Sequence, residues 1–172
     1  AGEGPVERSS FPEGRALPAS VHVGFAELQQ GIDATGTGYF RILGRDGDIT
    51  DEGIGTMLDF LDAFTRSPSA MPGFSITYDL RSLRNPSMTM VMRVAEWGAD
   101  PQRKETWEKL NRSCKIVISA GIRFSMSKGV LSAFFLMCPP IVRTYLLTDP
   151  DEAEDTATIF EPPARSSEAV AQ

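Results

Sequence analysis

A chain of 172 residues, 41% hydrophobic and 23% charged, has an ordinary globular composition, and its length suits one domain with a substantial core. The formal net charge of −6 argues against a nucleic-acid-binding surface, which requires a basic stripe. No apolar run approaches the roughly 18 residues of a membrane helix. One histidine, His22, and two cysteines cannot assemble a Cys/His metal site, and we expect no cofactor.

Both ends of the chain are polar. Residues 1–20 are rich in Gly, Pro, Ser and charge, with Phe11 and Leu17 as isolated apolar points. Segments of this kind do not bury enough apolar surface to fold alone, so they need a surface of the domain or of a partner to lie on. We therefore divide the chain into an extended N-terminal tail (1–20), a single α/β domain (21–160) and a C-terminal tail (161–172).

The first elements follow from apolar alternation and one helix start. Alternating apolar residues predict a strand over 21–25, and a second strand over 39–43 follows a glycine-rich link. Thr50 stands where an N-cap is expected, and two acidic residues follow it, which the helix dipole favours in a first turn. We therefore predict a helix from Thr50 to about Arg66.

The stretch from Gly73 to Trp97 organises the chain. It combines a buried strand ending near Asp79, a loop over 81–86, and a helix with Ser87 at its N-cap. A strand followed at once by a capped helix is the repeating unit of an α/β sheet. The predicted buried stripe of this helix consists of Met88, Val91, Met92 and Ala95.

The same unit recurs downstream. Asp100 followed by Pro101 predicts the start of a polar helix, which Trp107 and Leu110 anchor to the core. A strand over 115–120 comes next in the chain.

The last elements are also marked by start and stop residues. Ser127 predicts the cap of an apolar helix over 128–138, which two prolines stop. The last strand spans 142–147, and Asp149 before a proline predicts an acidic helix that ends near Phe160.

This order of elements predicts an α/β fold with a mixed, largely parallel four- to five-stranded sheet and helices on both faces. Open α/β sheets place ligands at the carboxyl ends of their strands. There, Arg81, Arg84 and Arg123 form a candidate anion-binding rim. Ser87 is a candidate phosphoacceptor or, more simply, a helix cap that satisfies free backbone N–H groups.

No motif brings a nucleophile, a base and an orienting group together. A Ser-His-Asp arrangement would have to use His22 on an early strand, and the chain has no GxSxG motif. We therefore expect a protein that is not an enzyme.

The segments SITYDL, PSMTMVMRVAEW, KIVISAG, RTYLLTD and PDEAEDT, taken together, resemble a STAS-type domain, the sulfate-transporter and anti-sigma-factor-antagonist family. The resemblance covers about Tyr39 to Phe160 and is to the antagonist-like branch in particular. It implies a phosphorylation-switched regulator with Ser87 at the switch position. The family's aspartate and glycine are absent from Asn85-Pro86-Ser87-Met88.

A second resemblance covers much the same part of the chain. TWEKLNRSCKIVISAGIRFSMSKGVLSAFFLMCPPIVRTYLLTD looks like the core of a CRAL-TRIO lipid-binding domain. This resemblance implies a lipid carrier with an apolar cavity beside the helix at Val130 to Met137. The usual N-terminal helical lobe is missing from the chain.

We expect a protein-binding domain that acts as a structural or assembly subunit of a larger complex, with the lipid carrier and the phosphorylation-switched regulator as alternatives. Its partners are other protein subunits, contacted through the tails, and Phe11, Leu17 and Trp107 are candidate partner anchors. If Ala1 is a processed start, the expected compartment is a chloroplast or mitochondrion, otherwise the cytoplasm. A photosynthetic complex such as a photosystem, or a respiratory membrane complex, suits a peripheral subunit of this kind.

Overall fold

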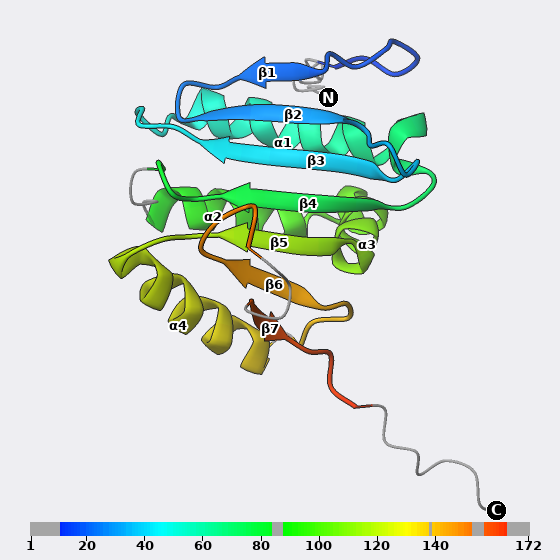
Figure 1. The fold of residues 1–172 in the computed structure, drawn as a ribbon. Helices are drawn as coiled ribbons and strands as arrows, with labels where there is room; N and C mark the ends of the chain where they lie inside the picture. Colours follow the sequence, from blue (N-terminus) through cyan, green and yellow to red (C-terminus); the bar gives the residue numbers. More distant parts are fainter. Residues whose placement is uncertain (1–10, 84–87, 138, 153–156, 165–172) are drawn as a thin grey trace, which may run out of the picture.

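Seven strands form one sheet in the computed structural model, and their order across the sheet is their order along the chain (Figure 1). The structure describes residues 11–83, 88–137, 139–152 and 157–164. The pairs β3–β4, β4–β5 and β5–β6 are parallel, whereas β1–β2, β2–β3 and β6–β7 are antiparallel. The strands are β1 (Ser20–His22), β2 (Ala26–Ile32), β3 (Gly38–Gly44), β4 (Phe74–Asp79), β5 (Cys114–Ile118), β6 (Thr144–Leu147) and β7 (Thr158–Phe160).

Helices connect the parallel strands. The helix α1 (Asp51–Thr65) joins β3 to β4, α2 (Met88–Ala99) and α3 (Lys104–Arg112) lie between β4 and β5, and α4 (Ile122–Met137) joins β5 to β6. Short 3-10 helices, η1 (Pro68–Ala70) and η2 (Pro101–Arg103), precede β4 and α3. Among the described residues, no helix has both the length and the apolar character needed to cross a membrane. The predicted α/β class with a mixed sheet is confirmed, with seven strands in place of four or five.

The two outermost crossover helices, α1 and α4, lie on the same face of the sheet. One row of side chains crosses five strands in register and therefore points to one face: Phe40, Ile76, Lys115, Thr144 and Phe160. At one end of the row, Phe40 contacts Phe60 of α1 with ring centroids 5.4 Å apart. At the other end, Phe160 contacts Phe135 of α4 at 5.3 Å.

This arrangement differs from the predicted cover of helices on both faces. Parallel strands that are added in one direction, each through a right-handed crossover, place every crossover helix on the same side. Helices on both faces require the direction of addition to reverse, and the strand order here does not reverse. In Figure 1, α1 and α2 lie behind the strands of the sheet.

The described part of the N-terminal tail packs on the chain's own domain. The ring of Phe11 lies 5.0 Å from that of Phe60, and Leu17 packs against the same core. The side-chain amide of Gln30 in β2 donates hydrogen bonds to the carbonyl oxygens of Leu17 (3.4 Å) and Pro18 (3.0 Å). Residues 11–19 therefore extend the core and lead directly into β1.

Two predicted helix starts are confirmed. Thr50 Oγ1 accepts a 3.1 Å hydrogen bond from the backbone N–H of Gly53 in the first turn of α1. Asp100 Oδ1 accepts a 2.9 Å hydrogen bond from the N–H of Gln102, and so begins η2, which leads into α3.

The segment predicted as a glycine-rich link, 29–38, is strand at residues 29–32 and at residue 38. β2 runs to Ile32 and pairs with β3 along its whole length. Asp33 closes the hairpin, because its Oδ1 accepts hydrogen bonds from the backbone N–H groups of Thr35 (2.9 Å) and Thr37 (3.1 Å). A hydrogen bond from the Thr35 hydroxyl, together with these backbone hydrogen bonds, lowers the pKa of Asp33.

Two predictions near the C-terminal end of the domain are wrong. α4 begins at Ile122, so Ser127 lies inside the helix, where its hydroxyl donates to Ser119 Oγ at 3.1 Å rather than capping a helix start. Residues 158–160 form β7, an antiparallel partner of β6, and not the end of an acidic helix. Asp149 starts only a turn, in which it accepts a hydrogen bond from the N–H of Asp151 at 2.9 Å.

The predicted buried stripe of α2 is also rotated. Met92 is 54% exposed and Ala95 is exposed, whereas Val94 and Trp97 pack against the core. The side chains of Met88 and Val91 lie outside the described set. Val94 and Trp97 stand three positions apart, which is also a helical spacing, so periodicity alone did not separate the two faces.

Candidate functional site

An ion pair within the chain lies at the carboxyl edge of the sheet. The sequence predicted an anion-binding rim at this edge. Arg81 donates from Nε to Asp79 Oδ1 (3.0 Å) and from Nη2 to Asp79 Oδ2 (2.7 Å), which is a bidentate contact. The hydrogen bonds from Arg81 lower the pKa of the Asp79 carboxyl. Asp149 lies further from the same guanidinium, at 3.9 Å. Arg81 is thus already compensated by carboxylates of its own chain.

Arg123 is likewise engaged within the chain. Its Nη1 donates to the carbonyl oxygen of Leu83 and, at 3.4 Å, to that of Leu80. Arg123 therefore connects the start of α4 to the turn that follows β4 through hydrogen bonds. Arg84 and Ser87, the other predicted residues of this edge, lie outside the described residues.

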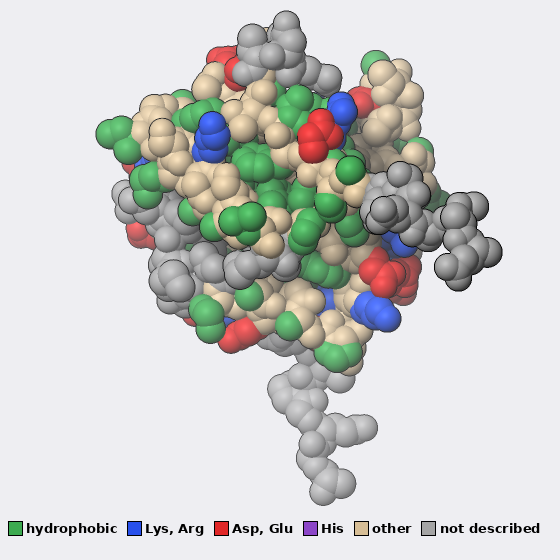
Figure 2. Space-filling view, turned by 90° about the horizontal axis from the view of Figure 1, so that it is seen from below, with side chains coloured by type: hydrophobic (Ala, Val, Ile, Leu, Met, Phe, Trp, Pro, Cys, Tyr) green, Lys and Arg blue, Asp and Glu red, His purple; other side chains and the backbone are tan. Residues whose placement is uncertain are grey.

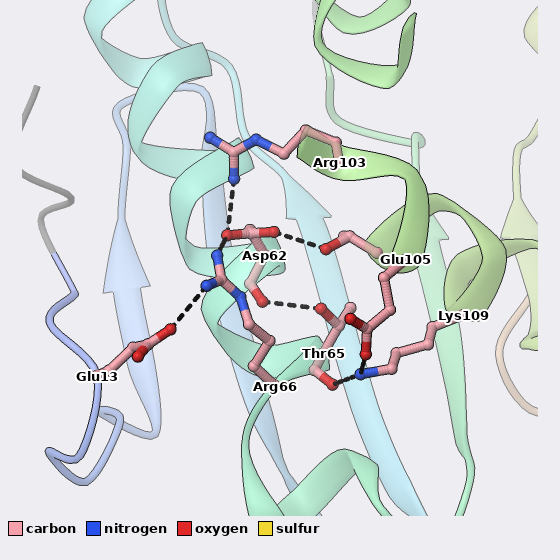
Figure 3. Close-up of polar contacts among 8 residues, drawn as sticks. Glu13, Asp62, Thr65, Arg66, Arg103, Glu105 and Lys109 are labelled. Carbon is pink, nitrogen blue, oxygen red and sulfur yellow. Dashed lines mark hydrogen bonds and ion pairs between the residues drawn. The ribbon is translucent and has the colours of Figure 1, made fainter. Parts of the chain in front are cut away.

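A second polar cluster lies in a groove on the helical side of the molecule. The groove has a volume of about 890 Å³ and is bordered by α1, α2 and α3. At its floor, the side chain of Asp62 is only 6% exposed. Asp62 Oδ1 accepts a 2.7 Å hydrogen bond from Thr106 Oγ1, and Oδ2 pairs with Arg103 Nη1 at 2.7 Å and with Arg66 (Figure 3).

This cluster joins segments that are distant in sequence. Arg66 also pairs with Glu13 of the N-terminal segment at 2.9 Å (Figure 3). The Arg103 guanidinium lies 5.4 Å from the ring centre of Trp97 in α2. Both oxygens of Asp62 are occupied by donors, which leaves no evident position for it to act as a general base. The cluster is therefore best interpreted as a structural contact between α1, α3 and the N-terminal segment.

The part of the chain that the structure describes contains no group of three or more His, Cys, Asp or Glu side chains able to hold a metal ion. Lys115, whose pKa is lowered by burial, donates to the carbonyl oxygens of Ser113 (3.2 Å) and Asn111 (3.4 Å). It contributes to the connection between α3 and β5.

The outer side of α4 exposes several large hydrophobic side chains. Ile122, Met126, Val130 and Leu136 expose 85%, 60%, 69% and 86% of their surface. These four residues are called the α4 face below. Ile141, just after the helix, is 63% exposed and adds to the same end of the molecule. Figure 2, which shows this end from below, has hydrophobic side chains grouped across its middle.

The α4 face also contains small residues. At 3.6 residues per turn, Ser125, Gly129 and Ala133 fall on the same side of the helix as the four large residues, and all three are exposed. No carboxylate occurs anywhere in α4. The inner side of the helix rests on the sheet through the contact of Phe135 with Phe160.

The sequence predicted an apolar helix here but not its exposure. An apolar residue on nearly every side of a helix is typical of a helix that is buried all round. In this structure the sheet covers one side of α4 only, and the opposite side remains exposed. The sequence signal for this exposure was the apolar content of the helix, because α4 has more apolar residues than packing on one face of a sheet requires.

Of the three predicted partner anchors, two are used within the chain. Phe11 and Leu17 pack on the core. Trp107 is 37% exposed and lies against α2, where a Cβ atom placed on Gly98 would be 3.1 Å from the indole ring. Trp107 thus offers only part of its surface to another molecule.

Comparison with protein-family models, curated proteins and solved structures finds no match for this chain. The resemblance to STAS-type and CRAL-TRIO domains therefore stays an expectation from the sequence.

Proposed function

We propose that this chain is a non-enzymatic protein-binding domain, a structural or assembly subunit that attaches to a partner through the α4 face. The observation that carries the proposal is the exposure of Ile122, Met126, Val130 and Leu136 on a single helix. Contiguous exposed apolar patches of more than a few hundred Å² mark interaction sites on globular proteins. Formation of a complex that removes such a patch from water is favourable.

The free energy available from burying the α4 face is large enough for a specific protein contact. Full burial of a large aliphatic side chain contributes about 1.5–3 kcal/mol, so four of them offer a gross gain of about 6–12 kcal/mol. A dissociation constant of 1 μM corresponds to about 8 kcal/mol of net binding free energy. After the costs of association, the α4 face alone supports a contact of at most moderate affinity.

The polar clusters favour binding over catalysis. The carboxylates of Asp62 and Asp79 both accept donors from arginines of the same chain. General acid–base catalysis needs a group within reach of a substrate and with a proton-transfer position open. The lipid-carrier alternative is less well supported, because Ile122, Met126, Val130 and Leu136 face outward rather than into the space between α4 and the sheet.

The proposal is tested by recovering the tagged chain from its source under native conditions and measuring the mass of the particle. We expect a particle heavier than the 18.8 kDa chain. Val130→Asp places a charge on the α4 face and should release the chain from that particle. Met71→Asp is the matched control, since Met71 is 82% exposed and lies just before β4, away from α4.

Both variants should keep the urea midpoint of the unmodified chain, because both positions are exposed. Recovery of the unmodified chain only as a single 18.8 kDa molecule would overturn the proposal. Equal retention of both variants in the heavier particle would exclude α4 as the attachment surface.

A further inference from the structure

We infer that the α4 face binds the α4 face of a second copy of this chain, with the two helices crossing at Gly129 around a two-fold axis. The inference rests on the proposed function and specifies its partner. It is carried by three features: the shape of the face, a glycine that no contact among the described residues explains, and the composition of the terminal segments.

The shape of the α4 face is self-complementary. Ile122, Met126 and Val130 follow one another at intervals of four and form a ridge. Ser125, Gly129 and Ala133 follow at the same interval and form a shallow groove beside it. A two-fold interface uses the same surface on both molecules, so a helix with a ridge and a groove can place each into the other on its copy.

Gly129 is the position where a second helix would approach most closely. Glycine inside a helix is less favourable than alanine, so it usually has a packing reason. The described residues supply none, because a Cβ atom placed on Gly129 would meet nothing within 4 Å among them. A neighbouring helix that crosses at this point supplies the reason, since small residues let two helix backbones come close together.

The terminal segments of this chain do not have the composition to cover the α4 face. The terminal segments 1–10 and 165–172 contain one large apolar residue each, Val6 and Val170. A charged partner is not favoured either, because α4 has no carboxylate and the guanidinium of Arg123 is bound to carbonyl oxygens of its own chain. Lys128 is exposed beside the face, where its long side chain can keep its ammonium in water at the rim.

The expected dimer is of moderate affinity. The face is one helix wide, which is at the small end of specific protein interfaces. We expect a dissociation constant in the micromolar range, so the monomer and the dimer should both be visible over an accessible concentration range.

The test is sedimentation equilibrium of the purified 172-residue chain over a range of concentrations. The unmodified chain should shift from the mass of one chain to that of two as the concentration rises. Val130→Asp should raise the dissociation constant at least about 100-fold, because it places a carboxylate without a partner in the apolar groove of the second copy. Met71→Asp should leave it unchanged.

Gly129→Ala gives the sharpest readout, because its two effects have opposite signs. The added methyl group favours the helix and should raise the urea midpoint of the monomer, yet it should weaken the dimer about tenfold by holding the backbones apart. Gly55→Ala in α1 is the matched control. Gly55 also lies inside a helix, and a Cβ atom there would be 3.9 Å from its nearest neighbour, Arg93. It should stabilise the monomer without changing dimerisation.

The outcomes separate this inference from the proposed function. A chain that stays monomeric at all concentrations, yet is recovered in a heavier particle that Val130→Asp disrupts, overturns the second copy as partner and keeps the proposed function. A dimer that Gly129→Ala and Val130→Asp leave unaffected uses another surface, which also overturns the inference.

Discussion

Arg103 Nη1 lies 2.7 Å from Asp62 Oδ2, and this contact ties the segment before α3 to the last turn of α1. The Asp62 side chain is 6% exposed, whereas that of Arg103 is 26% exposed. The pair therefore sits at the boundary between the core and the groove. The Asp62 carboxylate also accepts hydrogen bonds from the Thr106 hydroxyl and the Arg66 guanidinium. Asp62 therefore connects α1 to α3 and to the segment before it.

Asp62→Ala should destabilise the domain. The change leaves Arg103 and the Thr106 hydroxyl without their acceptor, and breaking a buried pair by removing one partner costs about 3–5 kcal/mol. Because both arginines of the cluster are partly exposed and can be solvated, we expect a loss of about 2–3 kcal/mol in unfolding free energy.

Urea denaturation measures this loss, and Glu105→Ala is its control. Glu105 is 81% exposed and pairs with Lys109 at the edge of the groove, so its removal should leave the midpoint unchanged. A midpoint for Asp62→Ala equal to that of the unmodified chain would show that the cluster contributes no net stability.

Gly38 at the start of β3 should not accept a side chain. A Cβ atom there would collide with the backbone carbonyl of Ser69 in η1 and would lie 3.2 Å from the carbonyl oxygen of Gly73. Backbone atoms cannot rotate away as a flexible side chain can, so Gly38→Ala should cost about 1–3 kcal/mol. Urea denaturation measures this cost, and Gly129→Ala is the control. A Cβ atom on Gly129 would meet nothing within 4 Å, so the difference between the two variants reports the collision at Gly38.

Local signals predicted the parts of the fold that depend on neighbouring residues. The caps at Thr50 and Asp100 are confirmed, because each needs only a side-chain oxygen and a backbone N–H two or three residues away. β2 was missed because its polar residues are satisfied by tertiary partners: Gln30, for example, bonds to carbonyl groups at positions 17 and 18. A sequence pattern does not contain those partners.

The candidate site could be predicted only in part for the same reason. The apolar character of α4 was evident in the sequence, but its exposure depends on the order of the strands, which leaves one side of the helix uncovered. Of the three predicted rim arginines, Arg81 and Arg123 lie near the carboxyl edge, and Arg84 is outside the described residues. The acceptors of Arg81 and Arg123, a carboxylate and two carbonyl groups, are contacts that only the folded chain defines.

Asp79 should make stability depend on acidic pH. Hydrogen bonds from Arg81 lower the pKa of Asp79 in the folded state. A carboxyl group with a lowered folded pKa contributes stability above its unfolded pKa of about 3.9, and this contribution is lost as the pH falls through the folded value.

Asp79→Asn removes this contribution. The variant should therefore be less stable than the unmodified chain at pH 6, and the difference should shrink as the pH falls below about 4. Urea denaturation at a series of pH values measures it. A difference that stays constant from pH 6 to pH 2 would mean that the ion pair is not its source.

Tyr78 should make stability depend on alkaline pH. Tyr78 packs against the core, and burial of its phenol raises the pKa of Tyr78 to about 12. An acid with a raised folded pKa keeps its proton in the folded chain while the unfolded chain ionises near pH 10, so stability falls between about pH 10 and 12. Tyr78→Phe removes this source of the fall, and its unfolding free energy should decline less over that range. Parallel declines for the two proteins would contradict the assignment.

Phe11 tests whether the N-terminal segment serves the domain or a partner. Its ring lies 5.0 Å from that of Phe60, on the same core that α1 and β3 build. Truncation of a buried aromatic side chain costs about 3–5 kcal/mol, and because Phe11 is only partly buried we expect about 1–3 kcal/mol for Phe11→Ala. Urea denaturation measures the loss, and Val130→Asp, which should affect only association, is the matched contrast. If Phe11→Ala weakened association while leaving the unfolding free energy unchanged, Phe11 would be the partner anchor that its isolated place in the sequence first indicated.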